Sequence, residues 1–358
     1  MSKLILLIFF SLSPSIHFAQ TFPSGEIQKI LNELIDDKQT FGSVVSIEAE
    51  NQTYHFASGN MEIDDPYFIA SISKLYTSAV LFKLIDQKRL SLDDSIKQYL
   101  TNETLDKLHV YKGKEYSKYI TIRHLLTNTS GLSDYFTQKN DKNESLFDIL
   151  ISNGDTLLTF DQIIEMTKSL SSKFPPGATS KAYYSDSNFQ LLGKIIQNIT
   201  GKTMTEVYEK HIFYPLSLQQ SYLFIDTHDT IPTNFYYKED KLNIPKMMSS
   251  FQSDGGIVST AKENLIFLKS YINGGLFSEK YVNIKTGWNK IFSPFQYGYG
   301  IMKFKFIGMP EMIGHSGANG SFAYYIPSEN LYITGTINQV NKPQLAYQLI
   351  AKILSKIK

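Results

Sequence analysis

Strand-like runs lie near both ends of the chain, and a long, mostly helical stretch separates them. Apolar β-like runs over 41–50 and 54–59 predict a hairpin around Asn51-Gln52, and runs over 322–326 and 332–337 predict two more strands joined by a turn. Residues 71–250 show helical periodicity or no clear pattern. Since strands from both ends must pair to bury their apolar faces, we predict an α/β (α+β) fold. Its antiparallel sheet is built from about 25–70 and 251–358 and is flanked by helices, and an inserted, mostly helical subdomain covers about 71–250.

The first residues are typical of an export signal. Lys3 precedes an apolar stretch that begins with residues 4–10, and a cleavage position follows Ala19. The stretch is shorter than the roughly 20 apolar residues that a membrane-spanning helix needs. We therefore expect residues 1–19 to be a signal peptide and residues 20–358 to form the mature domain. The expected location is periplasmic or extracellular, with no stable membrane span after signal removal.

Composition excludes several kinds of chemistry. The chain has no cysteine, so disulfides, thiolate zinc sites and a cysteine nucleophile are excluded. Its seven histidines show no H-x-x-x-H or H-x-H pairing, so we expect no metal site, and no cofactor is predicted. A net charge of +1 gives no electrostatic reason to expect a nucleic-acid partner.

A Ser-x-x-Lys step follows the predicted strand before residue 71. Ser71 and Lys74 lie three residues apart at the start of a helical pattern, so their side chains share one face. A partly desolvated lysine is able to accept the proton of a serine nucleophile, and the first helical turn offers free N–H groups to an oxyanion. The alternative is that Ser71 is only a helix cap. A second match, Ser259 to Lys262, is interpreted as a capping box formed by Thr260 and Glu263.

Two further stretches carry residues suited to a serine hydrolase. Tyr184 follows a Pro-Gly break and lies two residues before Asp186, and a tyrosine hydroxyl between two cations loses its proton more easily. His315 precedes Gly317, which permits close approach, and the Ala318 N–H is a candidate second oxyanion donor. Each residue taken alone is more often structural. The nearby G-x-S-x-G pattern at Ser316 is rejected as a nucleophile elbow, because a strand rather than a helix follows it and no later histidine exists.

Together these stretches resemble the penicillin-recognising serine hydrolases of the class C β-lactamase and DD-peptidase type. The ordered set is Ser71-x-x-Lys74, Tyr184-x-Asp186 and His315-x-Gly317, with supporting stretches at 120–131, 176–177, 184–193 and 254–260. The resemblance implies an acyl-enzyme mechanism without a cofactor. Ser71 would attack a carbonyl, Lys74 and Tyr184 would transfer its proton to the leaving group, and the N–H groups of Ser71 and Ala318 would hold the oxyanion.

The resemblance also implies that Asp186, His315, Gly317 and Ala318 bind the substrate. Two departures from the family pattern bear on which substrate that is. Asp186 stands where many members have asparagine, and His315, largely neutral at pH 7, stands where many β-lactamases have lysine. Both changes make the site less positive, so anionic β-lactams are less favoured. We expect a peptide or small-molecule acyl substrate, either a D-amino-acid peptide of the D-Ala-D-Ala type or a small ester. The alternatives are a β-lactamase and a sensor that is acylated without turnover; the oligomeric state is left open.

Overall fold

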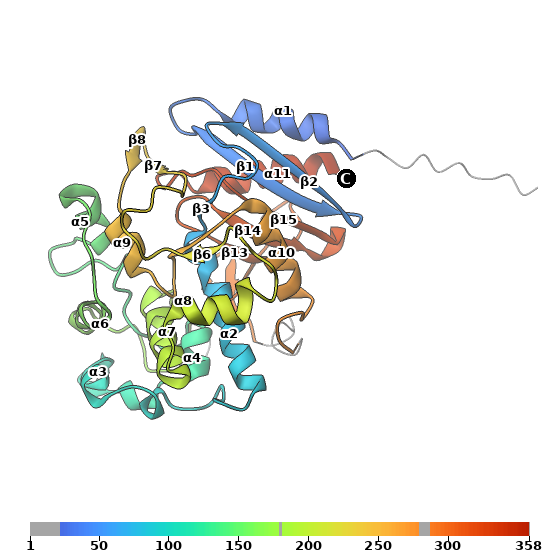
Figure 1. The fold of residues 1–358 in the computed structure, drawn as a ribbon. Coiled ribbons are helices and arrows are strands. Elements are labelled where there is room, and N and C mark those ends of the chain that lie inside the picture. Colours follow the sequence, from blue (N-terminus) through green and yellow to red (C-terminus); the bar gives the residue numbers. More distant parts are fainter. Residues whose placement is uncertain (1–21, 179–180, 279–286, 358) are drawn as a thin grey trace, which may run out of the picture.

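An antiparallel sheet of eight strands joins the two ends of the described chain. The computed structural model describes residues 22–178, 181–278 and 287–357. Its large sheet has the strand order β10-β11-β12-β13-β14-β15-β1-β2, so strands from the C-terminal part pair with the N-terminal hairpin (Figure 1). The predicted fold class is confirmed. The predicted signal peptide, residues 1–19, lies outside the described residues.

The large sheet consists of β1 (Gly42–Ala49), β2 (Gln52–Gly59), β10 (Asn289–Phe292), β11 (Phe295–Tyr297), β12 (Met302–Phe304), β13 (Met312–Ser316), β14 (Phe322–Ile326) and β15 (Leu331–Thr336). A three-stranded sheet contains β3 (Tyr67–Phe68), β9 (Ile257–Ser259) and β6 (Tyr222–Leu223). Two small hairpins are β4 (Val110–Tyr111) with β5 (Lys114–Glu115), and β7 (Phe235–Tyr237) with β8 (Asp240–Leu242).

The helices are α1 (Ser24–Leu34), α2 (Ser73–Asp86), α3 (Asn102–Leu105), α4 (Ile122–Leu126), α5 (Leu146–Asn153), α6 (Phe160–Ser169), α7 (Asp186–Thr200), α8 (Met204–Tyr208), α9 (Pro245–Ser250), α10 (Ala261–Ile272) and α11 (Gln344–Ile357). Helices α1 and α11 cover one face of the large sheet, whereas α10 and the helical part lie on the other (Figure 1). Most of the helical part lies between β3 and β9 in the sequence.

The N-terminal hairpin turns one residue earlier than predicted. Glu50 and Asn51 form the turn, both with positive φ (52° and 62°), and Gln52 already pairs with Ala49. Two consecutive residues with positive φ are typical of the type I′ turn, whose twist matches that of the paired strands. The predicted centre at Asn51-Gln52 is therefore wrong by one position, although the strands it joins are confirmed.

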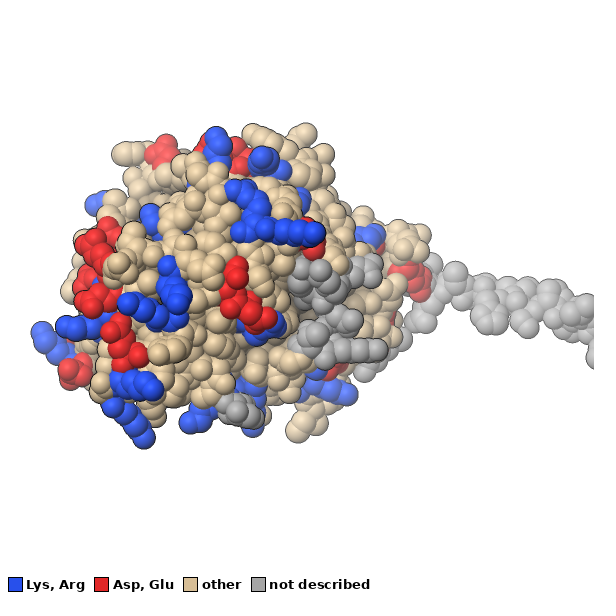
Figure 2. Space-filling view, turned by 90° about the horizontal axis from the view of Figure 1, so that it is seen from below, with Lys and Arg blue, Asp and Glu red and all other residues tan. Residues whose placement is uncertain are grey.

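The surface has a mixed charge pattern on the face that Figure 2 shows, where basic and acidic side chains are interspersed. Within the described ranges, no helix is both long and apolar enough to cross a membrane.

Candidate active site

The turn that carries Ser71 is fixed to the small sheet. Strand β3 pairs with β9, the Ile69 N–H donates to the Ile257 carbonyl at 3.0 Å, and the Ile257 N–H donates to the Ser73 hydroxyl at 3.2 Å. A 3₁₀ turn (Ala70–Ile72) then leads into α2. Ala70, directly before Ser71, has φ +47°, a conformation that costs a non-glycine residue about 1–3 kcal/mol and that clusters at functional sites. Ser71 thus stands on a constrained turn at the start of a buried helix.

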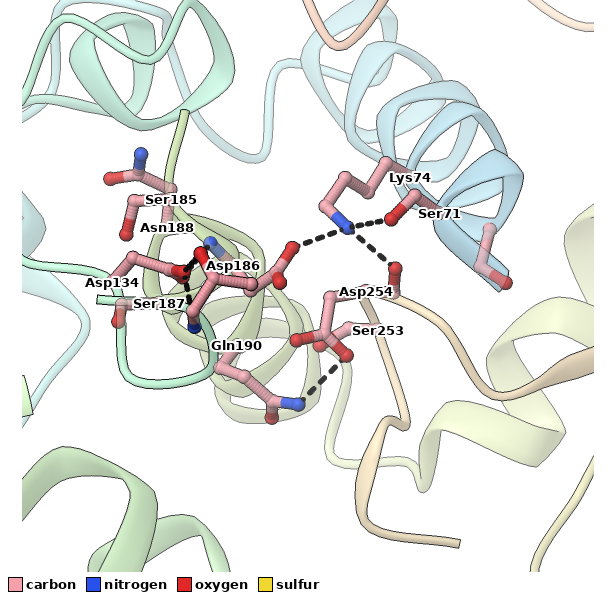
Figure 3. A network of polar contacts seen from close by, with 12 residues as sticks. Ser71, Lys74, Asp134, Ser185, Asp186, Ser187, Asn188, Gln190, Ser253 and Asp254 are labelled. Atoms are coloured by element: carbon pink, nitrogen blue, oxygen red, sulfur yellow. Dashed lines mark hydrogen bonds and ion pairs between the residues drawn. The ribbon is translucent and has the colours of Figure 1, made fainter. Parts of the chain in front are cut away.

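Lys74 joins Ser71 to two other segments. Its Nζ donates to Ser71 Oγ at 2.9 Å and to the Asp254 carbonyl at 2.7 Å, and it lies 2.7 Å from Asp186 Oδ1 (Figure 3). The Lys74 side chain is only 1% exposed. The structure therefore brings Ser71, Lys74 and Asp186 together, and Asp186 serves here as the ion-pair partner of the lysine.

The sequence analysis expected burial to make Lys74 a neutral amine that is able to act as a base, but the structure indicates a charged lysine. Burial by itself lowers the pKa of Lys74, but the charges of Asp186 and Asp254 outweigh it, so the pKa stands above its ordinary value. Lys74 is thus an ammonium in the resting site, and it must lose a proton before it is able to accept one from Ser71.

Tyr184 faces the same serine, but its phenol is not acidic. Burial and then the charge of Asp186 raise the pKa of Tyr184 well above its ordinary value, and a side-chain hydrogen bond with Ser71 lowers it only in part. The expectation that neighbouring cations make this phenol easier to deprotonate is therefore wrong, because burial and the charge of Asp186 dominate. Burial, followed by repulsion from Lys74, lowers the pKa of His315 to about 3, which confirms the prediction that this histidine is neutral at pH 7.

His315 lies in an aromatic cluster beside the site. Its Nδ1–H donates to the Ser316 carbonyl at 2.8 Å, so its Nε2 is left to accept from the Tyr297 hydroxyl at 3.3 Å. The Tyr184 ring packs edge-on against Tyr297, with centroids 5.7 Å apart, and lies 6.1 Å from the His315 ring. His315 is fully buried, and it orients tyrosines rather than presenting a charge.

Gly317 and Ala318 lie next to the Ser71 turn. A Cβ at Gly317 would come within 2.7 Å of the Ala70 Cβ and 2.9 Å of the Ile69 carbonyl oxygen, so this glycine allows the sheet to approach the turn. Ala318 lines the cavity that contains Ser71, and its N–H has no hydrogen-bond partner among the described residues. These positions suit Ala318 to the predicted role of oxyanion donor.

Asp254 and Tyr297 are site residues that the sequence analysis did not identify. The Asp254 carboxylate is buried and accepts from Tyr135 Oη at 2.8 Å and from Gln190 Nε2 at 3.0 Å. Burial raises its pKa to about 7 even though Lys74 opposes the change. The stretch 254–260 was part of the resemblance. Two glycines follow Asp254, and two more, Gly298 and Gly300, lie just after Tyr297; these glycines were the available sequence signal for a close approach of the backbone at both positions.

The two competing serine motifs are explained structurally. Ser259 shares a hydrogen bond of 2.8 Å with Ser221, and Lys262 pairs with the exposed Asp64. Thr260 caps α10 by accepting from the Glu263 N–H at 3.1 Å, which confirms half of the predicted capping box. The other half is wrong, because the Glu263 carboxylate binds the segment 219–221 instead.

Ser316 lies on the sheet face that α11 covers. Its hydroxyl is 2.8 Å from the Tyr347 hydroxyl of that helix, and strand β14 follows it in the sequence. The rejection of Ser316 as a nucleophile elbow is thus supported by its surroundings.

A cavity of about 580 Å³, including the open space at its mouth, begins at Ser71. Its lining includes Lys74, Asp186, Asp254, Ala318 and Asn319. Three other predicted site residues do not line it: Tyr184, His315 and Gly317. No cluster of three potential metal-ligating side chains is found in the part of the chain that the structure describes.

The antiparallel sheet, the helical part and a serine hydrogen-bonded to a lysine one turn later define the penicillin-recognising class of serine hydrolases. The chain belongs to the Beta-lactamase family, whose sequence model matches residues 27–355. Beta-lactamase-like protein 4 of Dictyostelium discoideum is 29% identical over 253 residues, which are 66% of this chain and 42% of that protein. The Putative D-alanyl-D-alanine carboxypeptidase of Escherichia coli (strain K12) is 24% identical over 315 residues, 77% of this chain and 70% of that protein.

Solved structures show the same fold. The D-amino acid amidase from Ochrobactrum anthropi SV3, in complex with L-phenylalanine amide, superimposes with a TM-score of 0.78 at 19% identity. The match covers 93% of this chain and 97% of the amidase. These relationships confirm the resemblance drawn from the sequence motifs.

Proposed function

We propose that this protein is a serine hydrolase that acts through an acyl-enzyme on D-amino-acid peptides, related amides or small esters. The observation that carries the proposal is the contact between Ser71 Oγ and Lys74 Nζ at a cavity that Ala318 also lines. A nucleophile, a proton-transfer group and an oxyanion donor are the three components that acyl transfer requires.

In this mechanism Ser71 Oγ bonds to the acyl carbon, and its proton passes through Lys74 and Tyr184 to the departing nitrogen or oxygen. The N–H groups of Ser71 and Ala318 hold the oxyanion. Water then releases the acyl group as an acid and restores the serine. Lys74 must first give up its resting proton, and the charge of Asp186, whose Oδ1 lies 2.7 Å from Nζ, opposes that loss.

The charge of the site favours this class over β-lactamase activity. Lys74 is paired with Asp186, and His315 is neutral, so neither is available to hold the carboxylate of a β-lactam. The related D-alanyl-D-alanine carboxypeptidase and the D-amino acid amidase fold are compatible with a D-aminoacyl substrate.

A turnover panel tests the proposal. The mature protein is assayed with a p-nitrophenyl ester, a D-amino acid amide, a D-Ala-D-Ala peptide and a chromogenic cephalosporin. Turnover of an ester, amide or peptide above the rate with the cephalosporin supports the proposal, whereas preferred hydrolysis of the cephalosporin identifies a β-lactamase. Stable acylation by a penicillin without turnover of any compound identifies a sensor.

We also propose that the protein is exported. The support is the sequence of the first 19 residues, with Lys3 ahead of an apolar stretch. N-terminal sequencing of protein recovered from outside the cytoplasm is expected to begin near residue 20, and retention of the full chain in the cytoplasm would contradict this.

A further inference from the structure

The cavity beside Ser71 has a polar end and an apolar body. Ser71, Lys74 and Asp186 are polar residues that line it, and Figure 3 shows the Lys74 side chain between the other two. The body is lined by side chains from several separate segments: Phe68, Phe136, Phe147, Leu150, Phe235, Leu242, Ile244, Met248, Phe251 and Val340. These side chains mostly belong to a small hydrophobic cluster that is distinct from the main core.

The aromatic side chains of the body contact one another. The Phe136 ring packs edge-on against Phe251, with centroids 5.1 Å apart, and against Phe147, with centroids 5.8 Å apart. Phe68 packs against Phe235 in the same manner at 5.8 Å. Edge-to-face contacts are the arrangement that aromatic rings favour, so these walls are also suited to a further ring from a ligand.

The cavity lies on the acyl side of the reacting bond. A leaving group must depart towards the residue that protonates it, which in the proposed mechanism is Tyr184. Tyr184 and its neighbour His315 do not line the cavity, whereas Asp186 and Ala318 do. The leaving group therefore departs away from the cavity, and the acyl part of the substrate remains in it.

The cavity offers no cation to a substrate carboxylate. Among the described residues that line it, Lys74 is the only cationic side chain, and it is already paired with Asp186 at 2.7 Å. The Asn319 amide is engaged as well, because its Nδ2 donates to the Phe68 carbonyl at 2.7 Å. A carboxylate placed here would lose its hydration without gaining a partner.

We infer that the cavity selects acyl groups that carry an aromatic ring and no carboxylate, such as a phenylacetyl or phenylalanyl group. This inference rests on the proposed function, because it assigns the acyl specificity of the same Ser71 site. Burial of a ring in such a pocket changes kcat/KM by about tenfold or more, the effect expected of even one methylene group in an apolar pocket.

Three p-nitrophenyl esters with the same leaving group test the inference: phenylacetate, acetate and hemisuccinate. We expect kcat/KM for the phenylacetate to exceed that for the acetate by at least about tenfold, and the hemisuccinate to fall below the acetate. Hydrolysis of acetate and hemisuccinate at rates equal to the phenylacetate would overturn the inference while leaving the hydrolase function intact.

A variant pair assigns the selectivity to the cavity. Phe147 is a half-buried wall residue on α5, so Phe147→Ala is expected to fold and to lower the phenylacetate-to-acetate ratio several-fold. Phe160 on α6 is also half-buried but does not line the cavity, so Phe160→Ala is the matched control and should keep the ratio. Equal ratios in both variants would contradict the assignment.

Binding to the Ser71→Ala variant separates the two proposals. Phenylacetamide and acetamide are titrated calorimetrically into this variant, which needs no turnover. We expect phenylacetamide to bind at least about tenfold more tightly. This result together with an inactive wild-type protein would refute only the proposed function, whereas equal binding of the two amides would refute the inference.

Discussion

The ammonium nitrogen of Lys74 lies 2.7 Å from a carboxylate oxygen of Asp186, inside the cavity that begins at Ser71. Because the charge of Asp186 raises the pKa of Lys74, the pair controls how much free amine is available to accept the serine proton. The position that the sequence analysis assigned to substrate binding thus has a second, electrostatic role.

Replacing Asp186 by asparagine should change the pH dependence of acylation. Loss of the carboxylate removes the interaction that raises the pKa of Lys74, so the amine becomes available at lower pH. We therefore expect the rising limb of kcat/KM against pH to move to lower pH in Asp186→Asn. Asp93→Asn, which removes an exposed carboxylate paired with Arg123, is the control and should leave the limb in place. An unchanged or raised limb in Asp186→Asn would contradict this role.

Removing the Tyr184 hydroxyl should slow acylation. Phenylalanine keeps the ring contact with Tyr297 but removes the proton relay to the leaving group. We expect the acylation rate of Tyr184→Phe to fall by at least ~10²-fold. Tyr183→Phe, at the neighbouring half-buried tyrosine, should retain its rate. Stopped-flow acylation that proceeds at the wild-type rate in Tyr184→Phe would remove Tyr184 from the mechanism.

Gly317 should not tolerate a side chain. The added methyl of Gly317→Ala would lie 2.2 Å from Ser321 Oγ and 2.7 Å from the Ala70 Cβ, so the strand must move away from the Ser71 turn. We expect a loss of about 1–3 kcal/mol in the free energy of unfolding, together with slower acylation. Gly25→Ala has no atom within 4 Å of its added Cβ and serves as the control. Denaturant unfolding checks both, and equal stability of the two variants would show that the close approach is unimportant.

Asp254 should make stability fall as pH rises. Burial raises its pKa from 3.8 to about 7, so between these values the folded state holds more proton than the unfolded state. The free energy of unfolding therefore decreases across this window. Asp254→Asn cannot titrate, and its amide is able to pair with both Tyr135 and Gln190. We expect the free energy of unfolding of Asp254→Asn, minus that of the wild type, to increase when the pH is raised from about 4.5 to about 8. A difference that stays the same at the two pH values would contradict the prediction.

The sequence predicted the longer strands better than the short ones. The strand over 322–326 has the predicted bounds, because its five residues form a continuous apolar run that is buried in the sheet. Strands β10 and β11 and the hairpin of β7 and β8 were not predicted. They contain only three or four residues each, too few for a period of two to be recognised.

The sequence predicted which residues form the candidate site better than it predicted their protonation states. An ordered set of short motifs placed Ser71, Lys74 and Tyr184 in one site, and the structure brings them together. Asp254 was missed because it contacts Lys74 through its backbone carbonyl. Every residue type has such a carbonyl, so the sequence does not reveal the contact. The protonation of Lys74 and Tyr184 was also mispredicted, since it depends on burial and on carboxylates from distant segments.

Covalent labelling of Ser71 tests the central claim most directly. The wild-type protein and the Ser71→Ala variant are incubated with a fluorophosphonate, and intact mass and peptide mapping locate the adduct. The account predicts one adduct per chain at Ser71 and none in the variant. Labelling that persists in Ser71→Ala, or an adduct at Ser259 or Ser316, would contradict it.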